Sequence, residues 1–228
     1  MNTDTIEIWH GNINAEDADH QSYWRVLDAA EQTQAGKFKN GLLRKRYVDV
    51  HGRLRNVLAQ ALNERPEKLN IKNAEHGKPY LADYPELAFN LSHSADIMVI
   101  AVGRNCRLGV DIEYCKPRTN LIGLVDKCFA EEEIAYWNRL PDAQKLLEFY
   151  RFWTRKEAFV KATGRGIGLG VNHCVIDPEN PAGFLRVPVG CGEASAWHVQ
   201  DIALGQGICS ALVMDKAIVG VRLIGFAS

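Results

Sequence analysis

The apolar positions between residues 141 and 164 repeat with the period of a helix and predict one long helix there. At about 100° per residue, one stripe of this helix carries the apolar residues Leu146, Phe149, Tyr150, Trp153 and Val160. Glu157 and Lys161 fall on the same stripe. Because an unpaired charge is costly to desolvate, we expect this face to meet a polar cleft rather than a dry core. The alternative is a solvated Glu–Lys pair one turn apart on a surface helix.

Other helical patterns precede the long helix. They predict helices over residues 16–27, from 27 to 35, over 41–62, over 119–128 and from 129 onward. The helix over 41–62 has an apolar face and carries Arg46, Arg53 and Arg55 at its edges. Most such charges are solvated, but as a cluster these guanidinium groups could hold a phosphate.

Alternation of apolar and polar residues predicts strands in the rest of the chain. One group covers residues 5–9, a segment from 71, and residues 87–94, 97–102 and 108–114. A second group covers residues 171–176, 184–187, 197–202, 208–214 and 217–224. Gly, Pro and Asp residues separate these segments and predict turns between them.

The strand over residues 108–114 carries two candidate metal ligands. Its period of two points Asp111 and Glu113 to one face and Val110 and Ile112 to the other. Two carboxylates on one face repel each other unless a cation lies between them. Hard oxygen ligands suit Mg²⁺ or Mn²⁺, which would keep water or substrate phosphate oxygens as further ligands. The alternative is an exposed edge strand with two surface acids.

Two turns are candidates for contact with a ligand. Ser92 and His93 lie where the strand over residues 87–94 passes into a turn, a place where a single histidine is also common as a structural residue. Gly77, Lys78 and Pro79 form a second turn, in which glycine allows the backbone to approach a planar group closely.

Composition and charge narrow the classes of partner. The net charge is −1 and the pI about 6.7, so no global basic field would attract nucleic acid or an anionic membrane. No segment approaches the roughly 18 apolar residues of a membrane span, and no basic and apolar leader opens the sequence. We therefore expect a cytoplasmic protein that binds neither nucleic acid nor membranes. The six cysteines show no CxxC spacing and indicate neither a zinc site nor a disulfide framework.

Three motifs, in this order along the chain, resemble those of one enzyme family. They are FNLSHS at residues 89–94, GVDIE at residues 109–113 and WTRKEAFVK at residues 153–161. Together they are similar to the motifs of the 4′-phosphopantetheinyl transferases of the surfactin-synthetase-activating type. The Lys-Glu-Ala tripeptide resembles the branch that has this tripeptide rather than Lys-Glu-Ser. The resemblance spans roughly residues 37–168.

The resemblance implies an α+β fold of two similar halves, residues 1–104 and 105–228, packed with pseudo-twofold symmetry around a ligand cleft. The first half would form the 3′-phosphate and adenine side of a coenzyme A site, and the second half the metal site and catalytic helix. The implied enzyme is a magnesium-dependent monomer. It would transfer the 4′-phosphopantetheine arm of coenzyme A to a serine of an apo acyl or peptidyl carrier protein and release adenosine 3′,5′-bisphosphate.

The motif match assigns a role to each candidate residue. Asp111, Glu113 and Glu157 would hold Mg²⁺ or Mn²⁺ against the pyrophosphate. Glu157 would also act as the base for the incoming serine, and Lys161 would bind the pyrophosphate and stabilise the leaving bisphosphate. The residues implied to bind coenzyme A are Ser92 and His93 at its phosphates, Gly77, Lys78 and Pro79 at the adenine, and Arg46 at the 3′-phosphate.

Two other functions are compatible with the same residues. One is a non-catalytic module that binds coenzyme A or a nucleotide, and the other is a metal-dependent nucleotide phosphohydrolase. The three acids and the lysine argue against simple binding, because binding alone needs the basic residues far more than metal ligands. The motifs leave open whether the carrier belongs to fatty-acid, polyketide, nonribosomal-peptide or reductase-linked systems.

Overall fold

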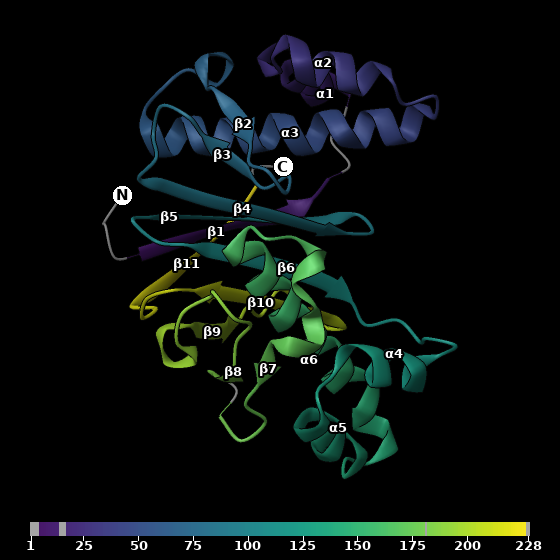
Figure 1. Ribbon diagram of the computed structural model, residues 1–228. Coiled ribbons are helices and arrows are strands. Elements are labelled where there is room, and N and C mark those ends of the chain that lie inside the picture. Colours follow the sequence, from purple (N-terminus) through teal and green to yellow (C-terminus); the bar gives the residue numbers. More distant parts are fainter. Residues whose placement is uncertain (1–4, 14–16, 181, 227–228) are drawn as a thin grey trace.

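The computed structural model describes residues 5–13, 17–180 and 182–226 and has the expected α+β fold. Figure 1 shows three N-terminal helices above the strands of a first sheet, with α4 and α5 at the opposite end of the molecule. Between these ends lie a four-stranded and a three-stranded sheet. None of the helices in the described ranges is long and apolar enough to cross a membrane.

The first sheet joins strands from both ends of the chain. Its order is β11 (Gly220–Gly225), β1 (Thr5–Asn12), β5 (Ile97–Arg104) and β4 (Leu87–Ser94). β1 is parallel to β11 and antiparallel to β5, and β4 and β5 form an antiparallel hairpin. The C-terminal strand therefore completes a sheet whose other strands come from the N-terminal half.

Three helices and a small hairpin cover one face of this sheet. They are α1 (Asp17–Val26), α2 (Ala29–Gly36), α3 (Gly41–Leu62), and β2 (Ile71–Asn73) paired with β3 (Pro79–Leu81) after the 3-10 helix η1 (Pro66–Lys68). α3 is capped at its N-terminus by Asn40, whose side chain accepts hydrogen bonds from the backbone amides of Leu42 and Leu43. Its buried Leu54 and Leu58 pack in one core with Phe89 of β4.

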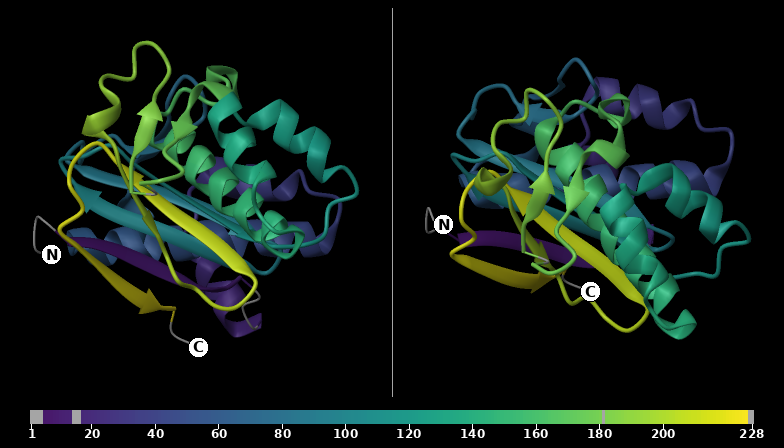
Figure 2. Two further views of the ribbon diagram at one scale, coloured as in Figure 1. Left: turned by 90° about the horizontal axis from the view of Figure 1, so that it is seen from below. Right: turned by 60° about the horizontal axis from the view of Figure 1, so that its bottom comes forward.

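The second sheet lies between the first sheet and the long helix. Its order is β6 (Leu108–Tyr114), β10 (Ile208–Met214) and β9 (His198–Asp201). Val110 and Ile112 of β6 pack with Ile8 of β1, so the even positions of β6 face the first sheet. The odd positions face α6 (Asp142–Thr163), which runs beside β10 in both views of Figure 2. The predicted alternation of β6 is confirmed. Asp111 is buried, which excludes an exposed edge strand at that position.

Gly109 allows β6 to lie directly against α6. A Cβ atom at this position would lie 2.1 Å from the carbonyl oxygen of Ala158 and 2.4 Å from the amide nitrogen of Ala162. Both atoms belong to the helix backbone, so no side-chain rotation could make room. Gly109 thus sets the close approach that brings the carboxylate of Asp111 to the last turns of α6.

α6 is enclosed on more sides than the sequence pattern predicts. Phe149, Tyr150 and Val160 of the apolar stripe are buried, and Phe159 and Lys156 on other faces are buried as well. The elements around the helix include α4 (Leu121–Cys128), α5 (Glu131–Asn138), β7 (Val175–Ile176) and β10. The helix is therefore a central element of the C-terminal half and not a one-sided amphipathic helix.

Several expected boundaries in the C-terminal half are wrong. Pro141 is the N-cap of α6 rather than part of its first turn. Of the predicted strand over residues 171–176, the first three residues form the 3-10 helix η3 (Val171–His173). The neighbouring segments include the 3-10 helices η2 (Ile167–Leu169) and η4 (Ala194–Ala196) and the short strand β8 (Phe184–Arg186), which pairs with β7.

The six cysteines are free thiols, and two of them are neighbours. The Sγ atoms of Cys115 and Cys209 lie 3.1 Å apart, where the end of β6 meets β10. These two thiols are neighbours in space although no cysteine spacing in the sequence indicated it.

Candidate functional site

A pocket of about 270 Å³ lies where the β2–β3 turn meets the last turns of α6, and we call it the central pocket. It is lined by Gly77, Lys78 and Pro79 from the turn and by Glu157 and Lys161 from the helix. Asn90 of β4 also lines it. Glu157 and Lys161 are half-buried and bring polar side chains to this pocket, whereas Phe149 and Tyr150 on the same stripe pack in a hydrophobic core. The expected polar cleft therefore borders only the C-terminal part of this face.

Asp111 lies in a hydrogen-bonded cluster beside this pocket. Its Oδ1 atom accepts from the ammonium of Lys161 at 2.6 Å and from the hydroxyl of Ser92 at 2.8 Å. Lys161 also donates to the Ser92 hydroxyl at 2.8 Å. Three residues that are distant in sequence, on β4, β6 and α6, are thus brought into direct contact.

Glu113 and Glu157 lie close enough to this cluster to interact electrostatically. Glu113 accepts a hydrogen bond from the Ser94 hydroxyl at 2.8 Å. Burial raises the pKa of Glu157 above its ordinary value, and the negative charges of Asp111 and Glu113 raise it further, against the opposing effect of Lys161. The site therefore concentrates negative charge around one ammonium group.

The residues at this site fit a divalent cation that is shared with a phosphate ligand. Asp111 Oδ2 is buried and has no hydrogen-bond partner among the described residues, so one carboxylate oxygen is free to accept a ligand. In the described part of the chain, no three His, Cys, Asp or Glu side chains form a group that would hold a metal ion by themselves. Mg²⁺ is commonly bound by one or two carboxylates together with phosphate oxygens and water, which suits Asp111 and Glu113.

Arg46 and His93 line a second pocket of about 210 Å³, here called the Arg46 pocket. His93 follows Ser92 on β4, and the period of two turns the two side chains to opposite faces of the strand. Partial burial lowers the pKa of His93, and the positive charges of Arg46 and Lys161 lower it further. Arg46 and Lys161 therefore act electrostatically on His93 from opposite sides of β4.

Lys78 makes contacts that the sequence did not indicate. Its Nζ atom donates to the carbonyl oxygens of Leu108 at 2.9 Å and Ala162 at 3.1 Å. Burial is the main cause that lowers the pKa of this lysine to about 8. Its amino group thus joins the β2–β3 turn to β6 and to the C-terminal end of α6, while its side chain forms part of the pocket wall.

Two of the three arginines predicted at the edges of α3 are not available to a ligand. Arg55 is fully buried, forms ion pairs with Asp28 and Glu31, and donates to two backbone carbonyls. Arg53 is also buried, with its guanidinium over the ring of Phe226. The expected three-arginine cluster is therefore wrong, because tertiary packing covers two of its members. Of these three arginines, Arg46 lines the Arg46 pocket.

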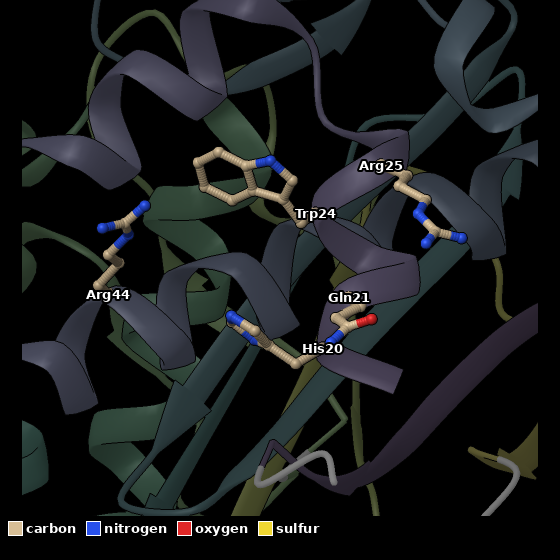
Figure 3. A pocket seen from close by; sticks show the side chains of 5 residues that line it. All are labelled: His20, Gln21, Trp24, Arg25 and Arg44. Atoms are coloured by element: carbon tan, nitrogen blue, oxygen red, sulfur yellow. The ribbon is translucent and has the colours of Figure 1, made fainter. Parts of the chain in front are cut away.

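A third pocket, shown in Figure 3, contains none of the residues predicted from the sequence. It has a volume of about 280 Å³ and lies between α1 and the start of α3, where His20, Gln21, Trp24, Arg25 and Arg44 line it. The guanidinium of Arg44 lies 5.2 Å from the centroid of the Trp24 ring. Arg44 is two residues from Arg46 and lines a different pocket, which makes it a useful control for Arg46.

Comparisons with known proteins match both parts of the chain. Residues 107–213 match the model of the 4′-phosphopantetheinyl transferase superfamily. Residues 12–105 match the model of a 4′-phosphopantetheinyl transferase N-terminal domain. The first match contains β6 and α6, and the second contains Arg46 and the β4 residues.

Individual relatives carry the same description. The chain is 33% identical to the 4′-phosphopantetheinyl transferase HetI of Nostoc sp., over 93% of this chain and 88% of the relative. It is 34% identical to the 4′-phosphopantetheinyl transferase AcpT of Salmonella typhimurium, over 62% of this chain and 74% of that protein. A 4′-phosphopantetheinyl transferase of Bacillus subtilis is 34% identical over 51% of this chain and 50% of its own length.

Proposed function

Since the chain belongs to the 4′-phosphopantetheinyl transferase superfamily, we infer that it transfers the 4′-phosphopantetheine arm of coenzyme A to a carrier protein. The acceptor is a serine hydroxyl of an apo acyl or peptidyl carrier protein, and adenosine 3′,5′-bisphosphate is the second product. The observation that supports this most is the contact of Lys161 with Asp111 and Ser92 beside Glu157 in the central pocket. A basic and an acidic group at one pocket suit a pyrophosphate that is cleaved there.

Coenzyme A would lie across the two pockets. Its adenine would contact the turn of Gly77, Lys78 and Pro79 in the central pocket. Its 3′-phosphate would bind to Arg46, and His93, beside Arg46, would donate to a phosphate oxygen. We also propose that coenzyme A binds in a cleft between two similar halves. These halves are residues 1–104 and 105–228, related by pseudo-twofold symmetry.

Asp111, Glu113 and Glu157 would hold Mg²⁺, or Mn²⁺, against the pyrophosphate. When bound, the cation would neutralise pyrophosphate charge and polarise the phosphorus that is attacked. Lys161 would release its hydrogen bond to Asp111 and donate instead to a pyrophosphate oxygen, where it would stabilise charge on the leaving bisphosphate. Ser92 would keep its hydrogen bond to Asp111 Oδ1, and Oδ2 would remain the oxygen that is open to the cation.

Glu157 would take the proton of the incoming serine. A hydroxyl is a weak nucleophile at its ordinary pKa and needs a base within hydrogen-bond reach. Glu157 lines the central pocket, so a serine hydroxyl that enters this pocket would come within reach of its carboxylate. Glu157 also lies one turn before Lys161, so the base and the pyrophosphate-binding group are on one rigid helix.

We also propose a branch within the transferase family, an oligomeric state and a cellular location for this chain. The Lys-Glu-Ala tripeptide at residues 156–158 supports the branch of the surfactin-synthetase-activating type that carries it. Two family matches in one chain support a covalently joined pair of halves and hence a monomer. A cytoplasmic location is a separate part of the proposal.

The test is an assay with coenzyme A, Mg²⁺ and a panel of apo carrier proteins, read by intact-protein mass spectrometry. We expect one carrier to gain the mass of one phosphopantetheine arm in the presence of the chain. Release of adenosine 3′,5′-bisphosphate at the same rate without any carrier would instead indicate a phosphohydrolase. Binding of coenzyme A without either product would indicate a binding module.

Arg46→Ala is expected to raise the KM for coenzyme A by about 10- to 100-fold, since a hydrogen bond to a charged group contributes ~1.5–3 kcal/mol. His93→Ala is expected to have a smaller effect, about 3- to 10-fold, because its lowered pKa keeps the ring neutral near pH 7. Steady-state kinetics at saturating carrier measure both. Arg44→Ala is the matched control, and an equal rise in KM for Arg44→Ala would remove Arg46 from the phosphate site.

The pKa of Glu157 is expected to lie above its ordinary value in the metal-free chain and to fall when Mg²⁺ and coenzyme A are added. The first part follows from burial and from the charges of Asp111 and Glu113, and the second from the favourable effect of a cation on a carboxylate. NMR titration of the ¹³C-labelled carboxyl groups measures the shift, with Glu157→Gln identifying the resonance. A pKa that does not change on addition of both ligands would argue against a cation beside Glu157.

A further inference from the structure

β4 and β6 lie side by side but belong to different sheets. Side chains at alternate positions of β4 join them. Asn90 Oδ1 accepts from the Val110 amide at 2.9 Å, the Ser92 hydroxyl donates to Asp111 at 2.8 Å, and the Ser94 hydroxyl donates to Glu113 at 2.8 Å. The period of two on each strand therefore places two serines opposite the two acids of β6.

The direction of the hydrogen bond between Ser94 and Glu113 is fixed by a third group. The Ser94 oxygen accepts from the amide of Tyr114 at 3.3 Å, so its own proton is available for Glu113 Oε2. In the described part of the chain, the Glu113 carboxylate has no other hydrogen bond. Ser94 thus holds one oxygen of Glu113 and leaves the other oxygen free.

Ser92 holds one oxygen of Asp111 in the same way. Lys161 can only donate, so the Ser92 oxygen accepts from its ammonium and the Ser92 proton is directed to Asp111 Oδ1. The other oxygen, Oδ2, is the buried atom without a hydrogen-bond partner. At each of the two acids, one oxygen is therefore held by a β4 serine and the second is open.

We propose that Ser94 is a positioning residue that orients the Glu113 carboxylate toward the metal ion it shares with Asp111. The proposal rests on the metal role given to Glu113 in the proposed function. It extends to Ser92, which holds Asp111 Oδ1 in the same way. Hydrogen bonds to metal-binding carboxylates fix their orientation, and removal of such a bond typically weakens metal binding by about 10- to 100-fold.

The test is Mn²⁺ binding to the full chain with saturating coenzyme A and no carrier, measured from the EPR signal of free Mn²⁺. Ser94→Ala is expected to raise the Kd for Mn²⁺ by about 10- to 100-fold. Ser94→Thr keeps the hydroxyl and is expected to stay within about threefold of wild type. Circular dichroism of each variant identifies any that fail to fold, and the Ser94→Thr comparison is made only between folded chains.

Ser210→Ala is the matched control. Ser210 is a buried serine of β10 opposite Ile112 of β6, and its hydroxyl has no hydrogen-bond partner among the described residues, so its removal is expected to leave Mn²⁺ binding unchanged. A Kd for Ser94→Ala within twofold of wild type would overturn the proposal, as would an equal loss in Ser94→Thr. If the wild-type chain transfers phosphopantetheine and the Ser94→Ala variant binds Mn²⁺ as tightly as wild type, only this inference is refuted. Mn²⁺ binding that depends on Ser94 in a chain without transferase activity would refute only the proposed function.

Discussion

Glu157→Gln is expected to lower kcat for phosphopantetheine transfer by about 10²- to 10⁴-fold, the usual contribution of a general base. Glutamine keeps the size of the side chain but cannot take a proton from the serine hydroxyl. The groups assigned to coenzyme A, such as Arg46 and Lys161, are unchanged, so the KM for coenzyme A should remain nearly constant. Steady-state kinetics with an apo carrier at saturating Mg²⁺ measure both parameters.

Glu148→Gln is the control for this variant. Glu148 lies on the same helix, is buried, and pairs with Arg151 outside the central pocket, so its change should leave kcat near the wild-type value. A Glu157→Gln enzyme with wild-type turnover would remove Glu157 from the reaction. A large rise in KM with unchanged kcat would make Glu157 a binding residue instead.

Lys156→Met is expected to lower the free energy of unfolding at neutral pH by ~3–5 kcal/mol, because it leaves a buried carboxylate without its counter-ion. Lys156 and Glu133 are both fully buried and lie 2.8 Å apart. Glu133 also accepts from the amides of Ala130 and Ile176, which fixes α5 and β7 against α6. Urea denaturation measures the change, which is a large part of the roughly 5–15 kcal/mol that holds a typical domain together.

The loss in Lys156→Met should shrink as the pH falls. Burial raises the pKa of Glu133, so the folded chain binds this proton more tightly than the unfolded chain. At a pH between the unfolded and the folded pKa of Glu133, this carboxyl group is protonated in the folded chain and ionised in the unfolded chain. Lowering the pH through this range therefore stabilises the folded state and removes the unpaired charge. The double variant with Glu133→Gln should regain part of the stability at neutral pH. Equal stability of Lys156→Met and wild type at neutral pH would contradict the account of this pair.

The local patterns of the sequence predict the main elements but not how they surround one another. The period of two in β6 correctly places Asp111 and Glu113 on one face, because alternation is a property of the strand itself. The period of α6 correctly groups Glu157 and Lys161 at a polar pocket. The same pattern does not show that Phe159 and Lys156 on other faces are buried as well, because partners from distant segments cover them.

The residues that the sequence reading missed act through long-range contacts. Nothing in the local sequence around Ser94 shows that it faces Glu113 on a strand of the other sheet. In the same way, nothing in the local sequence around Gly109 shows that it lies against the backbone of α6. Arg55 has the same local context as Arg46 but meets Asp28 and Glu31 of the chain before α3. Part of this arrangement was visible in the sequence. Asp28 and Glu31, the two acids that pair with Arg55, have the spacing of a capping box, which predicts the start of α2 at this point.

A crystal structure of the chain with coenzyme A and Mn²⁺ tests the central claim most directly, through the anomalous scattering of the metal. The account predicts a single Mn²⁺ bound to Asp111, Glu113 and Glu157, with pyrophosphate oxygens among its other ligands and Lys161 moved onto the pyrophosphate. A metal ion bound elsewhere, or a coenzyme A pyrophosphate that contacts neither this metal ion nor Lys161, would contradict it.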